Sequence, residues 1–559
     1  MPIDRFAFLR SPDYNKLYYD SKETYKPWSP AQAAGSPYGN ASTTAAKSNP
    51  VYGTGTFNVR DNRAASTTDN WVFTALRGMV VPDTAGTQYR NCDDNNANCG
   101  AWTAVPAGGI TVPDNRVFRV AMAYFPATFW VKEACTVGAG CTNLTPDGAT
   151  IKRYEIKAGN TFPSGRSYAD ELQNFANWFT YYRKRKQMLN AAMGQVLEPL
   201  TGLRMGMIRF NSLPGATTRI TMYDLDSPNP ANNGLKVAGL FYETNGSGGT
   251  PTRETLKRIG DEFANAAGPI QYACQRNNAF IVTDGFANVS NVNPPAYSKA
   301  TWGTGVPYET TYDNTLANLA LGFYTINPRP AMATGKVAKT AVDENTDLHI
   351  NTYGMTIGSR GVLYVDQNTA PPTDPAAWVN PTQARHPASV DDLWHATING
   401  RGKMYLADTP TETAAKIQAA MTDILSATGA QGGIAVSTIN LGRGDKTAYF
   451  GTYNPAGWAG DLTANPVDPL TGVVDSSNAK WKAAGLLAAR DWTTRVIATA
   501  SGGSGVGFTA ANVASTVNPG GVYGTDAEVI DYLRGDRTHE GTKFRTRTSL
   551  MGAVINSEP

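Results

Sequence analysis

Gly248-Gly-Thr-Pro251 opens a helical pattern, Thr252 to Ala267, which is followed by Asn278-Ala-Phe-Ile-Val-Thr-Asp-Gly285. The last stretch has four apolar residues in a row and then a polar break, which is typical of a buried strand. Thr250 therefore lies at a strand-to-helix turn, and Asp284 lies at the carboxyl end of the next strand. Ligands bind at that edge of an open α/β sheet. A hydroxyl and a carboxylate that converge there form half of a site for a hard cation.

This pair resembles two of the three metal-site loops of a von Willebrand factor A (vWA) domain, the Gly-Gly-Thr loop and the Thr-Asp-Gly loop. The alternative is that Thr250 only caps its helix and Asp284 only caps a turn. The third vWA loop, Asp-x-Ser-x-Ser, does not occur in the sequence, and Asp224-Leu-Asp226-Ser227 is the nearest imitation, with the wrong spacing. We therefore expect an incomplete vWA metal site made of Thr250 and Asp284.

The composition excludes several classes of protein. The chain has 559 residues, which is too long for one ordinary core and predicts two to four domains. Charged residues make up only 17%, with 55 Gly and 34 Pro, as in loop-rich and strand-rich extracellular proteins. A net charge of +3 over this length does not indicate the strongly basic surface of a nucleic-acid-binding protein. No stretch approaches the roughly 20 apolar residues of a transmembrane segment, and no signal peptide is visible in this chain.

The cysteines indicate an oxidising compartment. Cys92 and Cys99 flank a polar loop, and Cys135 and Cys141 flank a Gly-rich loop. Two close pairs in sequence rich in Gly, Thr and Asn are typical of local disulfides. A zinc site is the alternative, but neither pair has C-x-x-C spacing and no His lies nearby. Cys274 is left over, and we expect it to be an inert thiol in the core or at its edge.

The order of the elements predicts a doubly wound, Rossmann-like α/β sheet, because strands alternate with helices. One helix is expected over 167–197, with the basic run 183–186 on a solvated face. A strand is expected over 203–210 and a polar loop over 211–247. Beyond Asp284 the patterns predict, in order, a helix near 312–324, a strand over 351–357, a helix over 390–398, a strand over 402–407 and a helix over 410–427.

Three regions follow from this pattern. Residues 1–16 and 165–430 are expected to form the α/β domain. Residues 17–164 are expected to be an inserted β-rich module that holds both cysteine pairs. Residues 431–559 change character toward strands and Gly turns, and we expect a β-rich region there.

An ordered set of segments adds a resemblance that spans nearly the whole chain. The segments are 11–19, 175–183, 274–278, 392–396, 399–403, 458–462, 531–537, 544–549 and 554–559. In this order they resemble the PilY-type tip proteins of bacterial type IV pili. The resemblance implies a vWA-like N-terminal half with large insertions, followed by a C-terminal β-propeller that often binds calcium.

The resemblance also implies that parts of the family pattern lie outside this chain. In the family, the first strand with its Asp-x-Ser-x-Ser loop and a signal peptide precede the segment that matches Met1, and most of the propeller follows Pro559. We therefore expect no cofactor in the chain as it stands. Mg²⁺ is expected only in a full-length form, and Ca²⁺ only in the missing propeller.

The function implied is that of a surface protein at the pilus tip, outside the bacterial cell, in pilus biogenesis and adhesion. It would be no enzyme and would bind partners through the vWA-like domain. The partners implied are minor pilins, other pilus subunits and host or surface ligands, with no nucleic acid. The alternative is a secreted hydrolase with a propeller-like C-terminal part, against which the absence of a nucleophile–base pattern argues.

Two further motifs have both a functional and a structural interpretation. Two tripeptides, Arg443-Gly444-Asp445 and Arg534-Gly535-Asp536, match the adhesion sequence that integrins bind. The alternative is that the first is a hairpin turn and the second a structural motif. His395 follows Trp394 on a predicted helix, and we expect a hydrogen-bonded core histidine there rather than a catalytic one.

Overall fold

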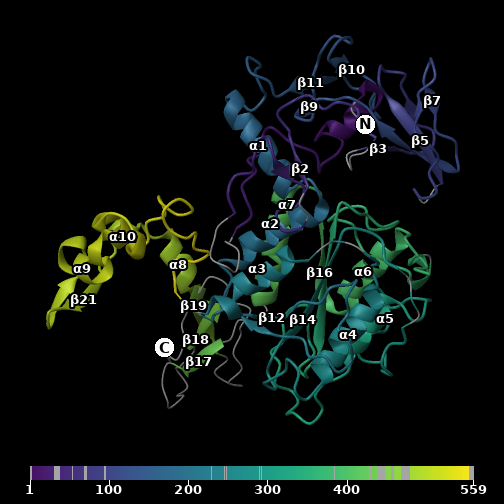
Figure 1. Cartoon of the computed structure of the whole chain (residues 1–559). Helices are drawn as coiled ribbons and strands as arrows, with labels where there is room; N and C mark the ends of the chain where they lie inside the picture. Colours follow the sequence, from purple (N-terminus) through teal and green to yellow (C-terminus); the bar gives the residue numbers. More distant parts are fainter. Residues whose placement is uncertain are drawn as a thin grey trace.

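A parallel sheet of three strands forms the centre of the chain, in the order β14–β15–β16 (Figure 1). The strands are β14 (Asn277–Thr283), β15 (Ile350–Ile357) and β16 (Arg401–Ala407). All three match predicted strands to within one residue at each end. The sequence pattern therefore located this sheet correctly.

The computed structural model describes most of the chain. The described residues are 3–29, 38–52, 55–67, 72–93, 96–227, 229–244, 246, 248–288, 290, 292–382, 384–426, 431–436, 447–454, 459–467 and 479–552.

Helices cover both faces of the central sheet. On one face Ala279 and Ile281 of β14 pack in a core with α4, α5 and α6; on the other face Tyr353 and Met355 of β15 pack with α2 and α7. β15 is buried along its whole length, as is usual for a parallel strand between two helical layers. The helices are α2 (Arg185–Leu197), α3 (Gly234–Tyr242), α4 (Thr252–Ala264), α5 (Leu316–Thr325), α6 (Ala388–Asn399) and α7 (Pro410–Ser426).

The buried carboxylate of Asp392 joins three of these helices. Asp392 lies on α6 and accepts hydrogen bonds from the backbone N–H groups of Leu316 and Ala317 at the start of α5, at 3.0 and 3.1 Å. It also forms an ion pair with Arg253 of α4 at 3.0 Å. Both partners of the pair are buried, with side chains 6% exposed. A negative charge at a helix N-terminus is favourable, so this contact fixes how α4, α5 and α6 pack on the sheet.

Residues before α1 form a β-rich layer, drawn mainly at the top of Figure 1, and part of it shares a core with α1 and α2. Its core contains Val81, Phe118 and Val120. The N-terminal 3₁₀ helix η1 (Asp4–Arg10) packs here, with Ala7 against Trp130. The strands are β1 (Ala46–Lys47), β2 (Thr56–Phe57), β3 (Phe73–Ala75), β4 (Val80–Val81), β5 (Gln88–Asp93), β6 (Thr103–Ala104), β7 (Ile110–Thr111), β8 (Arg116–Ala121), β9 (Thr128–Lys132), β10 (Cys141–Thr142) and β11 (Ile151–Glu155).

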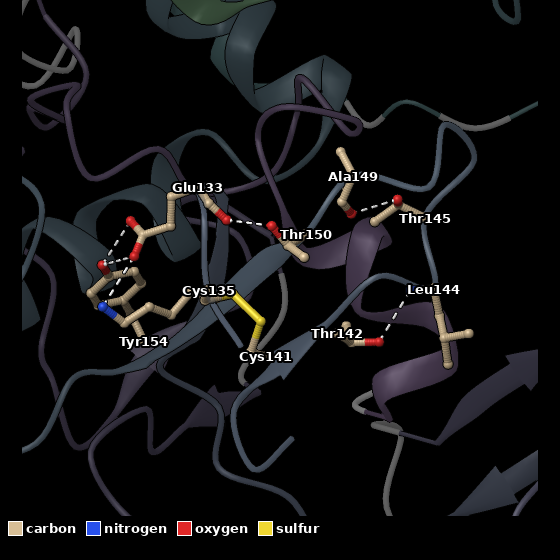
Figure 2. Close-up of a disulfide and its surroundings, with 10 residues drawn as sticks. Glu133, Cys135, Cys141, Thr142, Leu144, Thr145, Ala149, Thr150 and Tyr154 are labelled. Carbon is tan, nitrogen blue, oxygen red and sulfur yellow. Dashed lines mark hydrogen bonds and ion pairs between the residues drawn. A yellow bond between two sulfur atoms is a disulfide. The ribbon is translucent and has the colours of Figure 1, made fainter. Parts of the chain in front are cut away.

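Both predicted disulfides are present in this layer. Cys92 in β5 is bonded to Cys99, and Cys135 is bonded to Cys141 in β10. Figure 2 shows the second disulfide near Thr150, whose hydroxyl donates to the backbone oxygen of Glu133 at 2.8 Å. Each bond closes a short surface loop. On the chain-entropy account, a disulfide that closes a loop of this length stabilises the fold by about 2.5 kcal/mol.

The helix predicted over 167–197 is in fact two helices, α1 (Tyr168–Tyr181) and α2. α1 ends where Tyr182 and Arg183 both donate to the backbone oxygen of Trp178, and Lys184 then has extended backbone. The basic run is therefore not a uniformly solvated face. The guanidinium of Arg183 lies 4.0 Å from the centre of the Phe179 ring and donates to the backbone oxygen of Ser48. The helical spacing continues across the break because both helices face one apolar core.

Two predictions between α2 and α4 are wrong. Only Arg204–Met205 (β12) of the predicted strand over 203–210 forms a ladder, paired with β13 (Tyr223–Asp224). The polar loop predicted over 211–247 contains α3, which begins at Gly234 after Asn233, whose side chain accepts from the N–H of Leu235. This Asn cap was readable from the sequence.

Residues 431–559 begin with strands, as predicted, but end with helices. An antiparallel sheet has the order β17–β18–β19–β20, and a hairpin joins β21 to β22. After this sheet the helical elements prevail, since a run of Ala and Leu builds α8 and a Thr525–Glu528 capping box starts α10. The elements are β17 (Gln431–Val436), β18 (Thr447–Asn454), β19 (Ala459–Pro466), β20 (Trp481–Lys482), α8 (Ala483–Ala489), β21 (Ala498–Ser501), β22 (Ser504–Gly507), α9 (Ala510–Val517) and α10 (Asp526–Arg534).

Among the described helices, none combines the length and the apolar character that crossing a bilayer requires.

Candidate functional site

A cavity of about 1040 Å³ lies along the edge of β14 that faces away from β15. All of β14 lines it, together with the segment Leu203–Asn211. Apolar side chains of α2 and α7 line the cavity, and so do Ile259 and Phe263 of α4 from the opposite face of the sheet. We call this cavity the slot.

Thr250 and Asp284 both line the slot, and Asp284 directly follows β14. The Gly-Gly-Thr loop is bonded to the loop after β14, because the N–H of Thr250 donates to Asn288 Oδ1 at 2.6 Å and Asn288 N–H donates back to Thr250 O at 3.0 Å. Ser359 Oγ donates to the backbone oxygen of Asp284 at 2.8 Å. The structure therefore brings the two predicted residues to one end of the slot.

The backbone of the Gly-Gly-Thr loop requires glycine. Gly248 has a φ of 94°, in the region that side chains rarely adopt, and a Cβ there would come within 2.7 Å of Asn211 Cβ. Gly249 approaches Asn288 Oδ1 in the same way, at 2.9 Å from the position of a Cβ. The two glycines let this loop pack closely against both neighbouring loops.

The side chains at this end of the slot do not complete a cation site. Mg²⁺ demands near-octahedral oxygen ligands, and Thr250 and Asp284 supply one neutral hydroxyl and one carboxylate. Throughout the part of the chain that the structure describes, no group of three or more His, Cys, Asp or Glu side chains is placed to hold a metal ion. These residues by themselves do not fit Mg²⁺, and the metal site stays a prediction for a longer polypeptide.

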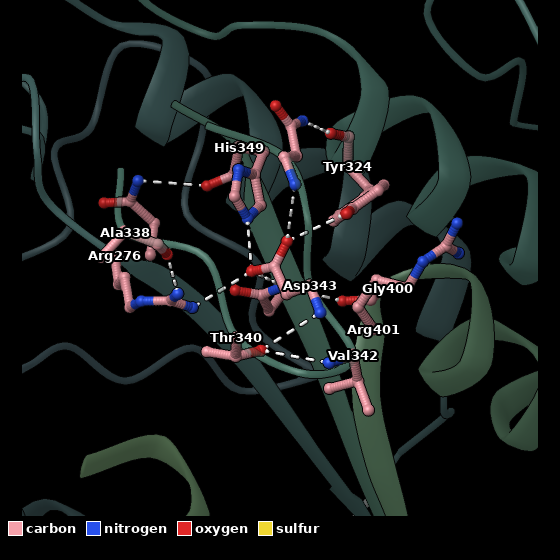
Figure 3. A network of polar contacts seen from close by, with 12 residues as sticks. Arg276, Tyr324, Ala338, Thr340, Val342, Asp343, His349, Gly400 and Arg401 are labelled. Atoms are coloured by element: carbon pink, nitrogen blue, oxygen red, sulfur yellow. Dashed lines mark hydrogen bonds and ion pairs between the residues drawn. The ribbon is translucent and has the colours of Figure 1, made fainter. Parts of the chain in front are cut away.

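A buried polar network lies near the opposite, amino end of β14 (Figure 3). The carboxylate of Asp343 accepts hydrogen bonds from Arg276 Nη1 at 3.1 Å, Tyr324 Oη at 2.9 Å and Asn351 Nδ2 at 3.2 Å. His349 Nε2 lies 3.0 Å from the same carboxylate. Burial alone would raise the pKa of Asp343, but the hydrogen bond and charge of His349, with the bonds from Tyr324 and Asn351, lower it to about 2. The carboxylate is therefore held ionised.

A half-buried lysine also faces the slot. Lys186 of α2 lines it and donates to the backbone oxygen of Phe241 at 2.7 Å and to the side chain of Asn190. Burial lowers the pKa of Lys186 to about 7. Lys186 belongs to the basic run that the sequence assigned to a solvated face, so sequence reasoning missed its place at the slot.

The structure also places two other predicted residues, His395 and Cys274. His395 is buried, as predicted: its ring stacks on Trp378 at 3.8 Å, and its Nε2 lies 3.0 Å from the backbone oxygen of Tyr308. Burial lowers the pKa of His395 to about 4, against the effect of the hydrogen bond to Tyr308. Cys274 is a free, exposed thiol that lines the slot. Of the two places expected for it, it therefore lies at the edge of the core and not inside it.

Of the two tripeptides, only 534–536 lies within the described residues. Arg534 Nη1 donates to the backbone oxygen of Phe508 at 2.9 Å, and its Nη2 donates to that of Arg495 at 3.1 Å. Gly535 ends α10 with a φ of 123°, and Asp536 accepts from Thr538. These contacts favour the structural interpretation. Arg443, Gly444 and Asp445 lie outside the described residues.

Sequence reasoning missed the Asp343 network and the slot. Arg276 lies 67 residues before Asp343, so no local spacing connects this ion pair, although His349 lies only 6 residues after Asp343. One sequence signal is associated with the slot. The apolar run at 203–210 predicts a strand, but the structure pairs only two of its residues.

Comparison with known proteins gives one group of relatives. The chain is 25% identical over 508 residues to the type IV pilus biogenesis factor PilY1 of Pseudomonas aeruginosa strain PAK, with 76% of this chain and 41% of the relative covered. It is 30% identical over 196 residues to a PilY1 homologue of Xylella fastidiosa, with 33% of this chain and 15% of the relative covered. The chain thus spans about two fifths of the length of the first relative, which is 41% covered. No family model and no solved structure matches.

Proposed function

Because this chain is related to the PilY-type pilus biogenesis factors, we propose that it acts in the biogenesis of type IV pili as a pilus-associated protein. The observation that carries the proposal is the length of the match, 508 residues that cover 76% of this chain. A shared short motif or a shared fold class would be weaker support, because one fold hosts many functions.

The place and the mode of action belong to the same proposal. The protein works outside the bacterial cell, at the pilus tip, where it contacts minor pilins and other pilus subunits and adheres to host or abiotic surfaces. Two local disulfides in the β-rich layer agree with an oxidising compartment. The protein binds its partners without catalysis, and nothing in the comparisons favours the hydrolase alternative.

The vWA-like interpretation of the α/β domain is supported by two features. Helices cover both faces of a parallel sheet. The Gly-Gly-Thr loop and the residue after β14 line one end of the slot. In open parallel sheets, ligand sites lie outside the carboxyl ends of the strands. We therefore propose that this end of the domain contacts partners.

Deletion of the gene in its host tests the proposal. We expect fewer surface pili in sheared preparations, reduced twitching movement and weaker attachment, with restoration by the wild-type gene on a plasmid. Normal piliation, movement and attachment in a deletion strain that has no second gene of this family would contradict the assignment. Loss of attachment with normal pili would support the role in adhesion and contradict the role in biogenesis.

A further inference from the structure

A row of four side chains crosses the sheet β3–β8–β5–β6 of the β-rich layer (Figure 1). The register pairs Thr74 of β3 with Arg119 of β8, and Arg119 with Arg90 of β5. Extending the pairing of β5 with β6 by one residue places Trp102 beside Arg90, and Arg90 Cζ lies 5.1 Å from the centre of the Trp102 ring. Residues paired across antiparallel strands share a face, so the four side chains lie side by side.

This row lies on the outer face of the sheet. The core of the layer contains Ala75, Phe118 and Val120, and these residues alternate along the strands with the members of the row. Gln88 and Ala104, which share the outer face with the row, are exposed. The outer face is therefore open to solvent, and the row forms part of the surface of the layer.

The two arginines of the row face each other without an acidic partner. Like charges directly opposite each other destabilise an antiparallel pair. Within the part of the chain that the structure describes, neither guanidinium has an ion pair or a hydrogen bond, and the buried Nε atoms of Arg90 and Arg119 have no acceptor. Asp93 is the one acid in these four strands. It lies three positions from Arg90, so it is on the opposite face, and it accepts hydrogen bonds from Ala97 and Asn98.

The chemistry of the row fits a sugar acid. A guanidinium binds a carboxylate through two parallel hydrogen bonds, and residues directly opposite in a ladder are only about 5 Å apart, so one carboxylate can contact both arginines. Trp102 is half-buried and presents a flat apolar surface to the ring of a sugar. The hydroxyl of Thr74, which is exposed, both donates and accepts hydrogen bonds, as sugar hydroxyls require.

The shape and the charge of the surface select among acidic polymers. The row crosses three strand spacings of about 4.8 Å, which makes an extended surface rather than a pocket. An acidic peptide would need an apolar pocket for an anchoring side chain. A nucleic acid would need many basic side chains along its phosphates, and the row has two.

We propose that the row Thr74–Arg119–Arg90–Trp102 binds an acidic polysaccharide, with a uronate carboxylate held between the two guanidiniums and a sugar ring against Trp102. The carboxylate supplies the acceptors that the arginines lack within the described chain. This inference goes beyond the role in pilus biogenesis and does not depend on it.

Titration calorimetry with a galacturonic acid hexamer tests the proposal on the complete 559-residue chain. The control is the same hexamer with its carboxylates methyl-esterified, which keeps the sugar rings and removes the charge. We expect the control to bind at least tenfold more weakly. Binding of the acidic hexamer should also weaken as salt is added, because the attraction at this open surface is screened.

Matched arginine variants locate the binding. We expect Arg119→Gln to weaken binding of the hexamer at least tenfold. Arg116→Gln removes an exposed arginine from the same strand, on the opposite face, and binding should be unchanged. Arg119→Lys keeps the charge without the planar fork and should lie between the two. Circular dichroism checks each fold, and Arg90→Gln repeats the test if Arg119→Gln is unfolded.

A stability measurement distinguishes a binding role from a structural one. Because Arg119 faces a like charge without an acid, Arg119→Gln should not lower the melting temperature in the absence of the hexamer. The hexamer should raise the melting temperature of the wild type and leave that of Arg119→Gln unchanged.

Four outcomes would overturn the inference. The first is no binding of the hexamer at millimolar concentration, and the second is equal binding of its methyl ester. The third is an equal loss of binding for Arg116→Gln and Arg119→Gln, which would reflect net charge alone. The fourth is binding of hexaglutamate or of free acetate as tightly as the hexamer, which would make the row a site for acidic peptides or for any small anion.

Discussion

Asp343 is the residue on which most polar contacts of the sheet's amino end converge. Its carboxylate accepts hydrogen bonds from Arg276, just before β14, from Tyr324 of α5 and from Asn351 of β15. Arg276 and Asp343 have side chains only 5% and 2% exposed. A buried ion pair of this kind is costly to break, because the remaining charge is left without its partner.

We expect Asp343→Asn to lower the free energy of unfolding by about 3 kcal/mol at neutral pH, since the charge of Arg276 loses its buried counterpart. Urea unfolding followed by circular dichroism measures the change. Glu344→Gln is the matched control, because Glu344 is the exposed acidic neighbour. A loss for Asp343→Asn no greater than that for Glu344→Gln would show that the network contributes little.

Asp343 also predicts a dependence of stability on acid. Its pKa is lowered from an ordinary 3.8 to about 2 in the folded chain. An acid whose pKa is lower in the folded state stabilises the fold above its unfolded pKa and loses that effect as the pH falls. The wild type should therefore lose about 2 kcal/mol between pH 4 and pH 2 that Asp343→Asn does not lose. Parallel stability curves for the two proteins over this range would contradict the prediction.

The cysteines give a prediction that separates the two disulfides from the free thiol. The sequence has five Cys, and the structure bonds four of them and leaves Cys274 exposed. Alkylation without reductant should label Cys274 alone, and alkylation after reduction in denaturant should label every cysteine. Peptide mapping identifies the sites. Labelling of Cys92, Cys99, Cys135 or Cys141 before reduction would refute an oxidised β-rich layer.

At the scale of elements, sequence patterns located the buried elements more reliably than the bordering ones. β15 and α6 are covered on both sides by this chain's own residues, so their apolar patterns alone determine their structure. The run at 203–210 also predicts a strand, but it borders the cavity, and only the two residues of β12 form a ladder there. The break between α1 and α2 was also missed, because helical spacing does not report a change of axis.

Local capping explains where α5 begins. Thr315 Oγ1 accepts from the backbone N–H of Asn318, and the Asn318 side chain accepts from the backbone N–H of Thr315. Such a capping box satisfies two donors that a helix start otherwise leaves unpaired. We expect Thr315→Val to lower the free energy of unfolding by about 1 kcal/mol. Urea unfolding measures it, with Thr311→Val, at an exposed position outside the helix, as control. Equal effects of the two changes would deny the cap its role.

At the scale of the whole molecule, the candidate site was only half readable. The sequence placed Thr250 and Asp284 at one edge of the sheet, and the structure has both lining the slot. The slot itself arises from β14, α2, α4 and α7 together, and no single stretch of sequence encodes it.

The last prediction concerns metal binding by Thr250 and Asp284. Thr250 and Asp284 lie on separate loops, and Mg²⁺ is bound weakly unless its octahedral geometry is largely prebuilt. We expect no Mg²⁺ or Mn²⁺ binding below millimolar concentration for residues 1–559, and no change on Asp284→Ala. A longer polypeptide that includes an Asp-x-Ser-x-Ser loop upstream should bind Mg²⁺, and there Asp284→Ala should abolish binding. Calorimetric titration of both forms decides the matter. A micromolar, Asp284-dependent site in residues 1–559 would mean that another residue already replaces the missing loop.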